Sequence, residues 1–217
     1  MVEDFSKRYS KEIGLPFYCL VRAELVNSES IGYLKEAGCY SVDMGIETAN
    51  DYLRNKVLNR EVSKEQIISA SDIIKRYKIK LRTNNMLGIP FGSLRDDLDT
   101  LKLNIRCRPD YAVATIFYLY KNTDLYNYLN INNRISYLSI TDKNKRYYQF
   151  LQLYRSKSEV KKTKNLHQLF SITVSLPFLL PLVKFLIRLP LYRIYKLVNY
   201  ILKKYYYRFK VFYYKDD

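Results

Sequence analysis

The chain has 217 residues, 48% of them hydrophobic, which suffices for one sizeable core or for one domain with an appendage. Its formal net charge is +16, and the excess lies towards the C-terminus, where residues 160–215 include 12 Lys and Arg but no Asp or Glu. The widely spaced cysteines Cys19, Cys39 and Cys107 exclude a disulfide framework and a paired-cysteine metal motif, and the polar N-terminus without an apolar leader favours a reduced, cytoplasmic location.

Four apolar segments are predicted to be strands, with helices between them. Asn27 is placed to cap the first of these helices, and Gly38 is placed to end it in the left-handed conformation. Ser63 and Gln66 match a capping box for a later helix, and Asn122 is expected to cap a short helix after the last strand. The predicted strands are 17–22, 41–47, 79–87 and 111–118, and the predicted helices are 28–37, 49–58, 64–77 and 94–105.

This alternation of strands and helices indicates parallel βα units, arranged either as a barrel or as an open doubly wound sheet. In both architectures ligands bind at the carboxyl ends of the strands. Side chains alternate along a strand, so the second strand has one apolar face and one face with two acids and a glycine. We expect the apolar face to pack under helices and the acidic face to meet a ligand cavity. The two faces are Val42, Met44 and Ile46, and Asp43, Gly45 and Glu47.

Four stretches covering roughly residues 15–130 together resemble the radical S-adenosylmethionine enzymes. They are LPFYCLVRAELV, YLKEAGCYSVDMGIETANDYLRNKVLNREVSKEQI, IKLRTNNMLGIPFGSLRDDLDTLKLN and RPDYAVATIFYLYKNTDLYNYL. They are most similar to the branch whose members often carry a cobalamin-binding domain upstream. The resemblance implies an α/β fold, with these strands as the later strands of a partial (β/α)6 barrel, and it implies S-adenosylmethionine and a four-iron-four-sulfur cluster as cofactors.

The resemblance also implies roles for charged residues at the strand ends. Glu47 matches the residue that contacts the ribose of the cofactor, since a carboxylate can accept hydrogen bonds from two vicinal hydroxyls. Arg60 matches the arginine that pairs with the methionyl carboxylate. Arg22 would point into the barrel from its strand. From the residues alone, Glu47 also suits a structural acid that closes a strand–helix turn, and Arg60 also suits a solvated cation at a helix end.

Three further residues match the part of the family site that surrounds the adenine. The turn of Gly88 and Pro90 resembles the loop that lies against the adenine, where glycine permits close approach of the backbone. Tyr118 would lie on the adenine side after the last strand. An ordinary strand exit is the alternative interpretation of the Gly88–Pro90 turn.

Other features of the family are missing from this sequence. The cluster motif CxxxCxxC is absent, as is the strand with the glycine-rich segment that precedes the matching part. We therefore assign no catalytic residue and no metal ligand, and interpret the chain as a truncated or degenerate radical enzyme that is inactive alone. A separate N-terminal half or cluster-bearing subunit would be its partner, and the missing strands would leave an open sheet edge. The alternative is a non-catalytic remnant or a membrane-associated, partner-binding subunit.

The chain is divided at residue 140 into the barrel portion, 1–140, and a mostly helical, basic and hydrophobic extension, 141–217. Residues 165–183 carry no charge, and alternating aromatic, aliphatic and cationic residues follow. This composition suits contact of 165–217 with an anionic membrane surface, peripheral at its inner face, and equally suits a helical cap packed on the barrel. A spanning helix and nucleic-acid binding are less favoured.

Two single residues complete the sequence-based interpretation. Arg54 is interpreted as a surface cation in an ion pair that contributes little stability. His167, the only histidine, lies near the tail and is not expected to be catalytic.

Overall fold

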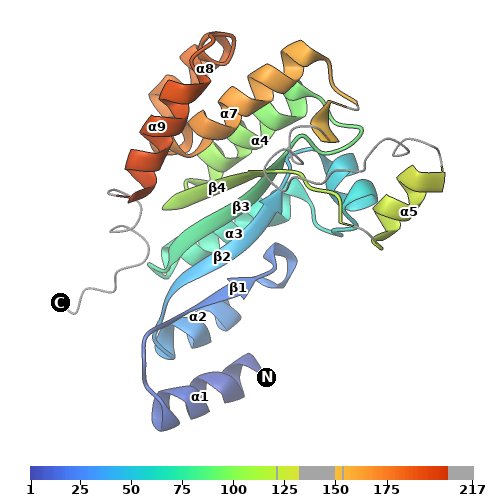
Figure 1. Ribbon diagram of the computed structural model, residues 1–217. Helices are drawn as coiled ribbons and strands as arrows, with labels where there is room; N and C mark the ends of the chain where they lie inside the picture. The colour runs from blue at the N-terminus through green and yellow to red at the C-terminus, as the bar shows by residue number, and fades with distance from the viewer. Residues whose placement is uncertain (121, 132–149, 153, 205–217) are drawn as a thin grey trace.

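The computed structural model describes residues 1–120, 122–131, 150–152 and 154–204 (Figure 1). In this part of the chain four parallel strands form one sheet in the order β1-β2-β3-β4. Because the order in the sheet equals the order in the sequence, the sheet shows the sequential winding of a β/α barrel and no reversal of the doubly wound type. The strands are Phe17–Val21 (β1), Cys39–Glu47 (β2), Lys80–Leu87 (β3) and Tyr111–Ile116 (β4).

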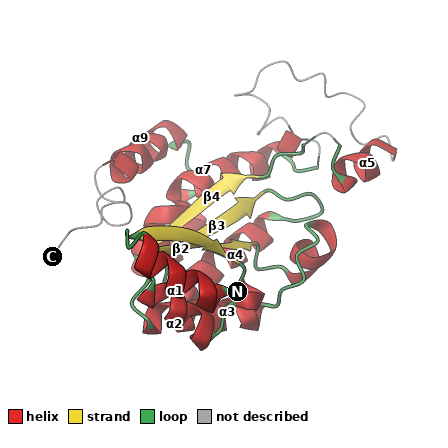
Figure 2. Ribbon diagram, turned by 90° about the horizontal axis from the view of Figure 1, so that it is seen from below, coloured by secondary structure: helices red, strands yellow, loops and turns green. Residues whose placement is uncertain are grey.

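Apart from α5, which lies beyond the ends of the strands, the helices form a layer on one face of the sheet, as Figures 1 and 2 show. Among them, α2 contacts β2, α3 and α4 contact β3, and α7 contacts β4. The α/β fold predicted from the sequence is confirmed. The helices described are Val2–Glu12 (α1), Ser28–Glu36 (α2), Lys64–Arg76 (α3), Leu94–Cys107 (α4), Asp124–Ile131 (α5), Lys157–Ser175 (α7), Leu180–Leu186 (α8) and Tyr192–Leu202 (α9).

Local capping signals set most of the helix starts. Asn27 Oδ1 accepts a hydrogen bond from the Ser30 amide at the start of α2, and Ser63 and Gln66 form the predicted capping box of α3. The cap of α5 differs from the prediction. Thr123 Oγ1 accepts the Tyr126 amide there, while Asn122 adopts a left-handed turn conformation with φ of 66°.

The first core lies between the sheet and helices α2 and α3. Val42, Met44 and Ile46 of β2 are completely buried there against Ile67 and Ile74 of α3, so the predicted apolar face of β2 is confirmed. Each such side chain contributes about 1.5–3 kcal/mol on burial. The opposite face of β2 is therefore the one that remains for a ligand.

A second core joins the tail to the sheet through α7. Phe170 and Leu166 of α7 are buried against Leu101 of α4 and Ala112 of β4. The predicted domain boundary at residue 140 lies outside the described residues. Among the helices that the structure describes, none combines the length and apolar character needed to cross a membrane.

Side chains of α7 also reach the outer edge of β4. In the parallel ladder the Phe117 amide donates to the Leu87 carbonyl of β3, so the carbonyls of Ala112 and Ala114 point away from β3. Ser171 Oγ donates to Ala112 O at 2.6 Å, and His167 Nε2 donates to Ala114 O at 3.0 Å. These carbonyls are thus satisfied without another strand.

Candidate functional site

Glu47 ends β2 in a conformation that side chains rarely adopt. Its φ is 61°, in the left-handed region, which costs a non-glycine residue about 1 kcal/mol or more. Its side chain is only 9% exposed, and Oε1 accepts a hydrogen bond from Arg60 Nη2 at 3.2 Å. The carboxylate lies over Gly45, where a Cβ would approach Oε1 to 2.6 Å. The strained backbone and the missing Cβ together leave room for a carboxylate at this edge.

Burial raises the pKa of the Glu47 carboxyl, and the positive charge of Arg60 opposes this rise. Among the described residues only Arg60 hydrogen-bonds this carboxylate, through Oε1, so the second oxygen can accept hydrogen bonds from a ligand. A second ion pair lies on the same face of the sheet, where Arg82 Nη1 is 3.4 Å from Asp43 Oδ2. Burial also raises the pKa of Asp43, against the opposing effect of Arg82. This face therefore carries charges that the protein only partly solvates.

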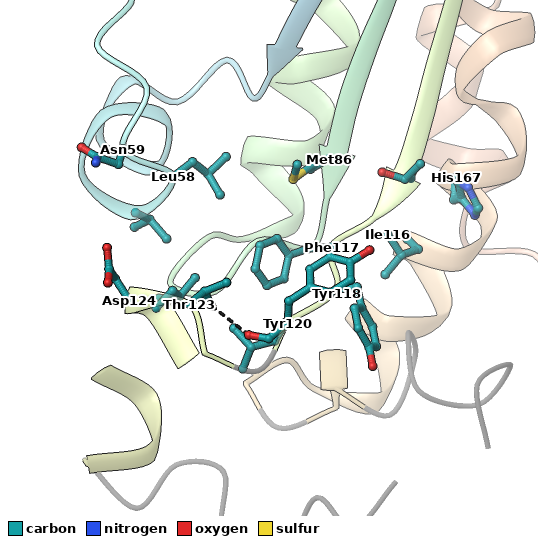
Figure 3. Close-up of a pocket in the computed structure, with 14 residues that line it drawn as sticks. Leu58, Asn59, Met86, Ile116, Phe117, Tyr118, Tyr120, Thr123, Asp124 and His167 are labelled. Carbon is teal, nitrogen blue, oxygen red and sulfur yellow. Dashed lines mark hydrogen bonds between the residues drawn. The ribbon is translucent and has the colours of Figure 1, made fainter. Parts of the chain in front are cut away.

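A cavity of about 600 Å³ opens at the carboxyl ends of β3 and β4 (Figure 3). Its walls come from the π-helical turn Leu53–Val57 with the residues after it, from β3, from the segment after β4 and from α5. A cavity of this size and aromatic character is typical of small-molecule sites. β4 and α7 also contribute to the lining, through Ile116 and His167, and the other lining residues include Asn59, Met86, Phe117, Tyr118 and Tyr120.

One of the predicted site residues lines the cavity, and the others lie outside it. Tyr118 lines the cavity, with its ring edge-on to that of Tyr120 at 4.9 Å. Glu47 and Arg60 are brought together as an ion pair and are not cavity-lining residues, although Asn59, next to Arg60, forms part of the wall. The roles implied for these three residues stay predictions.

Gly88 and Pro90 are buried within the protein. The Gly88 amide donates to Asp97 Oδ1 at 2.9 Å, and its carbonyl accepts from the Tyr154 hydroxyl at 2.6 Å. Its φ is 72°, and a Cβ would lie 2.6 Å from Leu151 Cδ1. Glycine is therefore required at position 88 by the chain itself, and an adenine contact at this turn stays a prediction.

Arg22 follows β1 and pairs with a neighbour in the chain. Its Nε donates to Glu24 Oε1 at 2.5 Å, and its side chain is 59% exposed. The structure thus supplies the partner that sequence could not identify, while a role of Arg22 inside a complete barrel stays a prediction.

Arg54 does not lie at the surface, contrary to the sequence-based interpretation. It is completely buried, and its guanidinium donates to the carbonyls of Thr48 at 2.7 Å and Val62 at 2.8 Å while pairing with Asp51. Its fork of donors satisfies carbonyls on both sides of the π-helical turn that separates Glu47 from Arg60. Arg54 therefore positions the segment that carries Arg60.

Sequence reasoning also missed a buried ion pair under the site. Asp97 of α4 and Arg155, which precedes α7, are both almost inaccessible, and Arg155 Nη2 donates to Asp97 Oδ1 at 3.3 Å. Thr163 of α7 donates to Asp97 Oδ2 at 3.3 Å. The signal for Asp97 was its helical spacing from the buried residues Leu101 and Asn104.

The cysteines do not fit an iron–sulfur cluster. Cys19 Sγ and Cys39 Sγ are 3.9 Å apart, while Cys107 is buried in the helical layer beside Ser71. In the described ranges no group of three or more His, Cys, Asp or Glu side chains could hold a metal ion. A cluster needs at least three thiolates on one site, and these residues do not provide them.

Comparisons with known proteins point to one fold. No family model matches the chain. An uncharacterized methyltransferase of Pyrococcus horikoshii is 26% identical over 131 residues, which are 60% of this chain and 28% of that protein. The radical S-adenosylmethionine methyltransferase TsrM of Kitasatospora setae, solved with cobalamin and a four-iron-four-sulfur cluster, has a TM-score of 0.54 at 11% identity.

The match to TsrM covers 62% of this chain and 27% of that one, and the TsrM complex with tryptophan and a cofactor analogue gives the same values. The chain thus spans little more than a quarter of each of these proteins. At this identity the likeness shows the fold, which is a partial β/α barrel of the kind found in radical S-adenosylmethionine enzymes.

Proposed function

We propose that this chain is the later part of a radical S-adenosylmethionine barrel and binds the adenosyl portion of that cofactor. The observation that carries the proposal is Glu47, a strained and desolvated carboxylate held at the carboxyl edge of a parallel sheet beside Arg60. Strained residues and perturbed carboxylates concentrate at ligand sites. The resemblance of the sequence to this superfamily and the shared fold support the same assignment.

Each site residue has a task suited to its chemistry. Glu47 would accept hydrogen bonds from the ribose hydroxyls, and Arg60 would pair with the carboxylate of the methionyl group. The aromatic cavity with Tyr118 would take the adenine ring, whose flat faces suit stacking and apolar contact. Methyl transfer is the reaction class that the two methyltransferase likenesses support.

The iron–sulfur cluster would come from outside the cysteines of this chain, on a separate N-terminal half or a cluster-bearing subunit. The sheet offers a place for such a partner. β1 is the terminal strand of the described sheet, and Tyr18 and Leu20 on its open face are largely exposed. A partner strand could extend the sheet there through backbone hydrogen bonds.

Calorimetric titration of the whole chain with S-adenosylhomocysteine tests cofactor binding without the cluster. We expect saturable binding that weakens roughly 10- to 100-fold in Glu47→Gln and in Arg60→Gln, as for the loss of about 1.5–3 kcal/mol in charged hydrogen bonds. Arg95→Gln, a change at an exposed helix position, serves as the matched control. Equal affinity of Glu47→Gln and the unchanged chain would refute the assignment.

Anaerobic reconstitution with iron and sulfide tests the need for a partner. We expect no stoichiometric cluster on this chain alone, because only Cys19 and Cys39 lie together and a cluster needs at least three thiolates on one site. A stoichiometric cluster that cleaves S-adenosylmethionine would contradict the partner proposal while leaving cofactor binding intact.

A further inference from the structure

One face of helix α9 packs on the protein, and the face exposed to solvent is also apolar. Tyr195 and Asn199 face the protein and are buried. A second row of aliphatic residues, spaced i, i+3, i+4 and i+7, is exposed to solvent, and Leu197 within it is 59% exposed. We call this row the α9 stripe, and it consists of Ile194, Leu197, Val198 and Ile201.

The preceding segment presents a similar row. Phe178, Leu182 and Phe185 are spaced i, i+4 and i+7 across the turn Pro177–Leu179 and α8, and Phe178 is 71% exposed. We call these three residues the α8 stripe. Helices α8 and α9 both lie at the end of the helical layer remote from α1 (Figure 1). Two exposed apolar rows at one end of the protein are typical of an interaction surface.

The positions of both stripes are fixed by contacts with α7. Asn199 Nδ2 donates to Gln168 Oε1 at 3.0 Å, and Asn165 Nδ2 donates to Ile187 O at 2.9 Å and to Leu189 O at 2.8 Å. The Tyr195 hydroxyl donates to Leu186 O at 3.0 Å. Because these polar contacts hold the inner faces of α8 and α9 against the protein, the two stripes lie on the outer faces of the helices.

Cations flank the stripes. Lys184 and Arg188 lie on α8 and just beyond it, and Arg193 and Lys196 lie on α9, all with exposed side chains. On a helical projection Arg193 and Lys196 occupy the side of α9 between the stripe and the buried face. Since residues 160–215 contain no acid, the surface is cationic as well as apolar.

We propose that the α8 and α9 stripes with their flanking cations form a docking surface for an anionic lipid membrane. An interfacial helix buries an apolar face among the acyl chains and places Lys and Arg at the headgroups, and this surface supplies both elements. The helices lie along the membrane plane because their inner faces remain packed on α7. A nucleic acid would use the cations but would leave seven exposed aliphatic and phenyl side chains without a function.

Flotation of the whole chain with vesicles tests this surface. We expect binding to vesicles with roughly a third of anionic phosphatidylglycerol that exceeds binding to pure phosphatidylcholine about tenfold or more, because the flanking cations are attracted to the anionic headgroups. The combined change Leu182→Ser, Phe185→Ser, Leu197→Ser and Ile201→Ser should abolish flotation. Leu15→Ser with Leu25→Ser, at exposed positions elsewhere, is the control and should float as the unchanged chain does.

The absence of tryptophan from the chain permits a second, site-specific measurement. A single Leu197→Trp should show blue-shifted emission with anionic vesicles and quenching by brominated acyl chains, whereas Tyr52→Trp at a remote exposed position should show neither.

Three outcomes would overturn the proposal. The first is an unshifted Leu197→Trp emission in the presence of bound vesicles, and the second is vesicle binding that survives loss of both stripes. The third is association with something other than a membrane, in the absence of vesicle binding. It would appear either as salt-sensitive binding to a polyuridine RNA that needs only the cations, or as a dimer in light scattering that the stripe changes dissociate.

Discussion

At the residue scale, the site is characterised by Glu47, which is destabilising for the fold in two ways. Its backbone lies in the left-handed region, and its carboxylate is mostly removed from water. Asn or Gly would tolerate the same backbone better. Both costs support the proposal that Glu47 serves a ligand rather than the stability of the strand–helix turn.

The pH dependence of stability should reveal the cost of the Glu47 charge. Its folded-state pKa lies above the ordinary value of 4.5 for a glutamate, so the stability it contributes is complete below that pH and is lost as the pH rises through the folded-state pKa. We expect Glu47→Gln to be more stable than the unchanged chain at pH 7, with a difference that shrinks as the pH falls towards 4.5. Urea unfolding across this range measures it, and a difference independent of pH would contradict the assignment.

His167 should give the opposite dependence. Burial, aided by the charge of Lys203, lowers its pKa from 6.5 to about 4. A depressed pKa contributes stability that is present above pH 6.5 and is lost as the pH falls through about 4, on the order of 2–3 kcal/mol of it between pH 7 and pH 4.5.

Because the carboxylates also titrate in acid, the informative quantity is the difference between the unchanged chain and His167→Gln in urea unfolding. The difference in the free energy of unfolding between the two chains should change by about 2–3 kcal/mol between pH 7 and pH 4.5. A constant difference would mean that burial does not hold the imidazole neutral.

At the element scale, sequence predicted what is local and missed what is distant. The caps at Asn27 and Ser63 bond within three residues, so their patterns identified the starts of α2 and α3. Asp97 contacts Arg155, 58 residues away, and no local pattern reports such a partner. Arg54 was predicted to lie at the surface for a related reason. Its partners are backbone carbonyls, and every residue has one, so the sequence does not show that Arg54 binds them. The ion pair of Glu47 with Arg60 likewise depends on the conformation of the loop between them, which the sequence does not specify.

The β3–α4 connection should tolerate no side chain at Gly88. Gly88→Ala combines a φ of 72° with a contact of 2.6 Å to Leu151, and we expect a loss of about 1–3 kcal/mol in the free energy of unfolding. Gly32→Ala in the interior of α2 is the matched control. It should stabilise by up to about 1 kcal/mol, since the nearest atom lies at 3.4 Å. Thermal denaturation of both variants decides whether Gly88 is required by the fold.

At the scale of the whole molecule, the buried pair of Asp97 and Arg155 connects the sheet-forming part to the tail. Asp97 bonds to the Gly88 amide, to Arg155 and to Thr163 of α7, so one carboxylate joins the β3 exit, α4 and α7. The tail is thereby attached by polar contacts as well as by the second core.

Asp97→Asn should therefore destabilise the whole molecule by about 3–5 kcal/mol, because it leaves the buried guanidinium of Arg155 uncompensated. The double change Asp97→Leu with Arg155→Leu should recover much of this loss, since it removes both charges. Asp99→Asn, at a half-exposed position of the same helix, should change stability by less than about 0.5 kcal/mol. Chemical denaturation measures the stability of all three variants. A double variant that is less stable than Asp97→Asn would contradict this account.

The hydrogen bonds from Ser171 and His167 to the outer carbonyls of β4 make the two ends of the sheet unequal. In the described part of the chain β1 is the terminal strand at one end of the sheet, and two outer carbonyls of β4 are already occupied at the other, so we expect strand addition at β1 and not at β4. Fibrous aggregates need two adhesive edges on each molecule, whereas the sheet that the structure describes would offer one. If two copies meet edge to edge through β1, both adhesive edges are consumed, and self-association stops at the dimer.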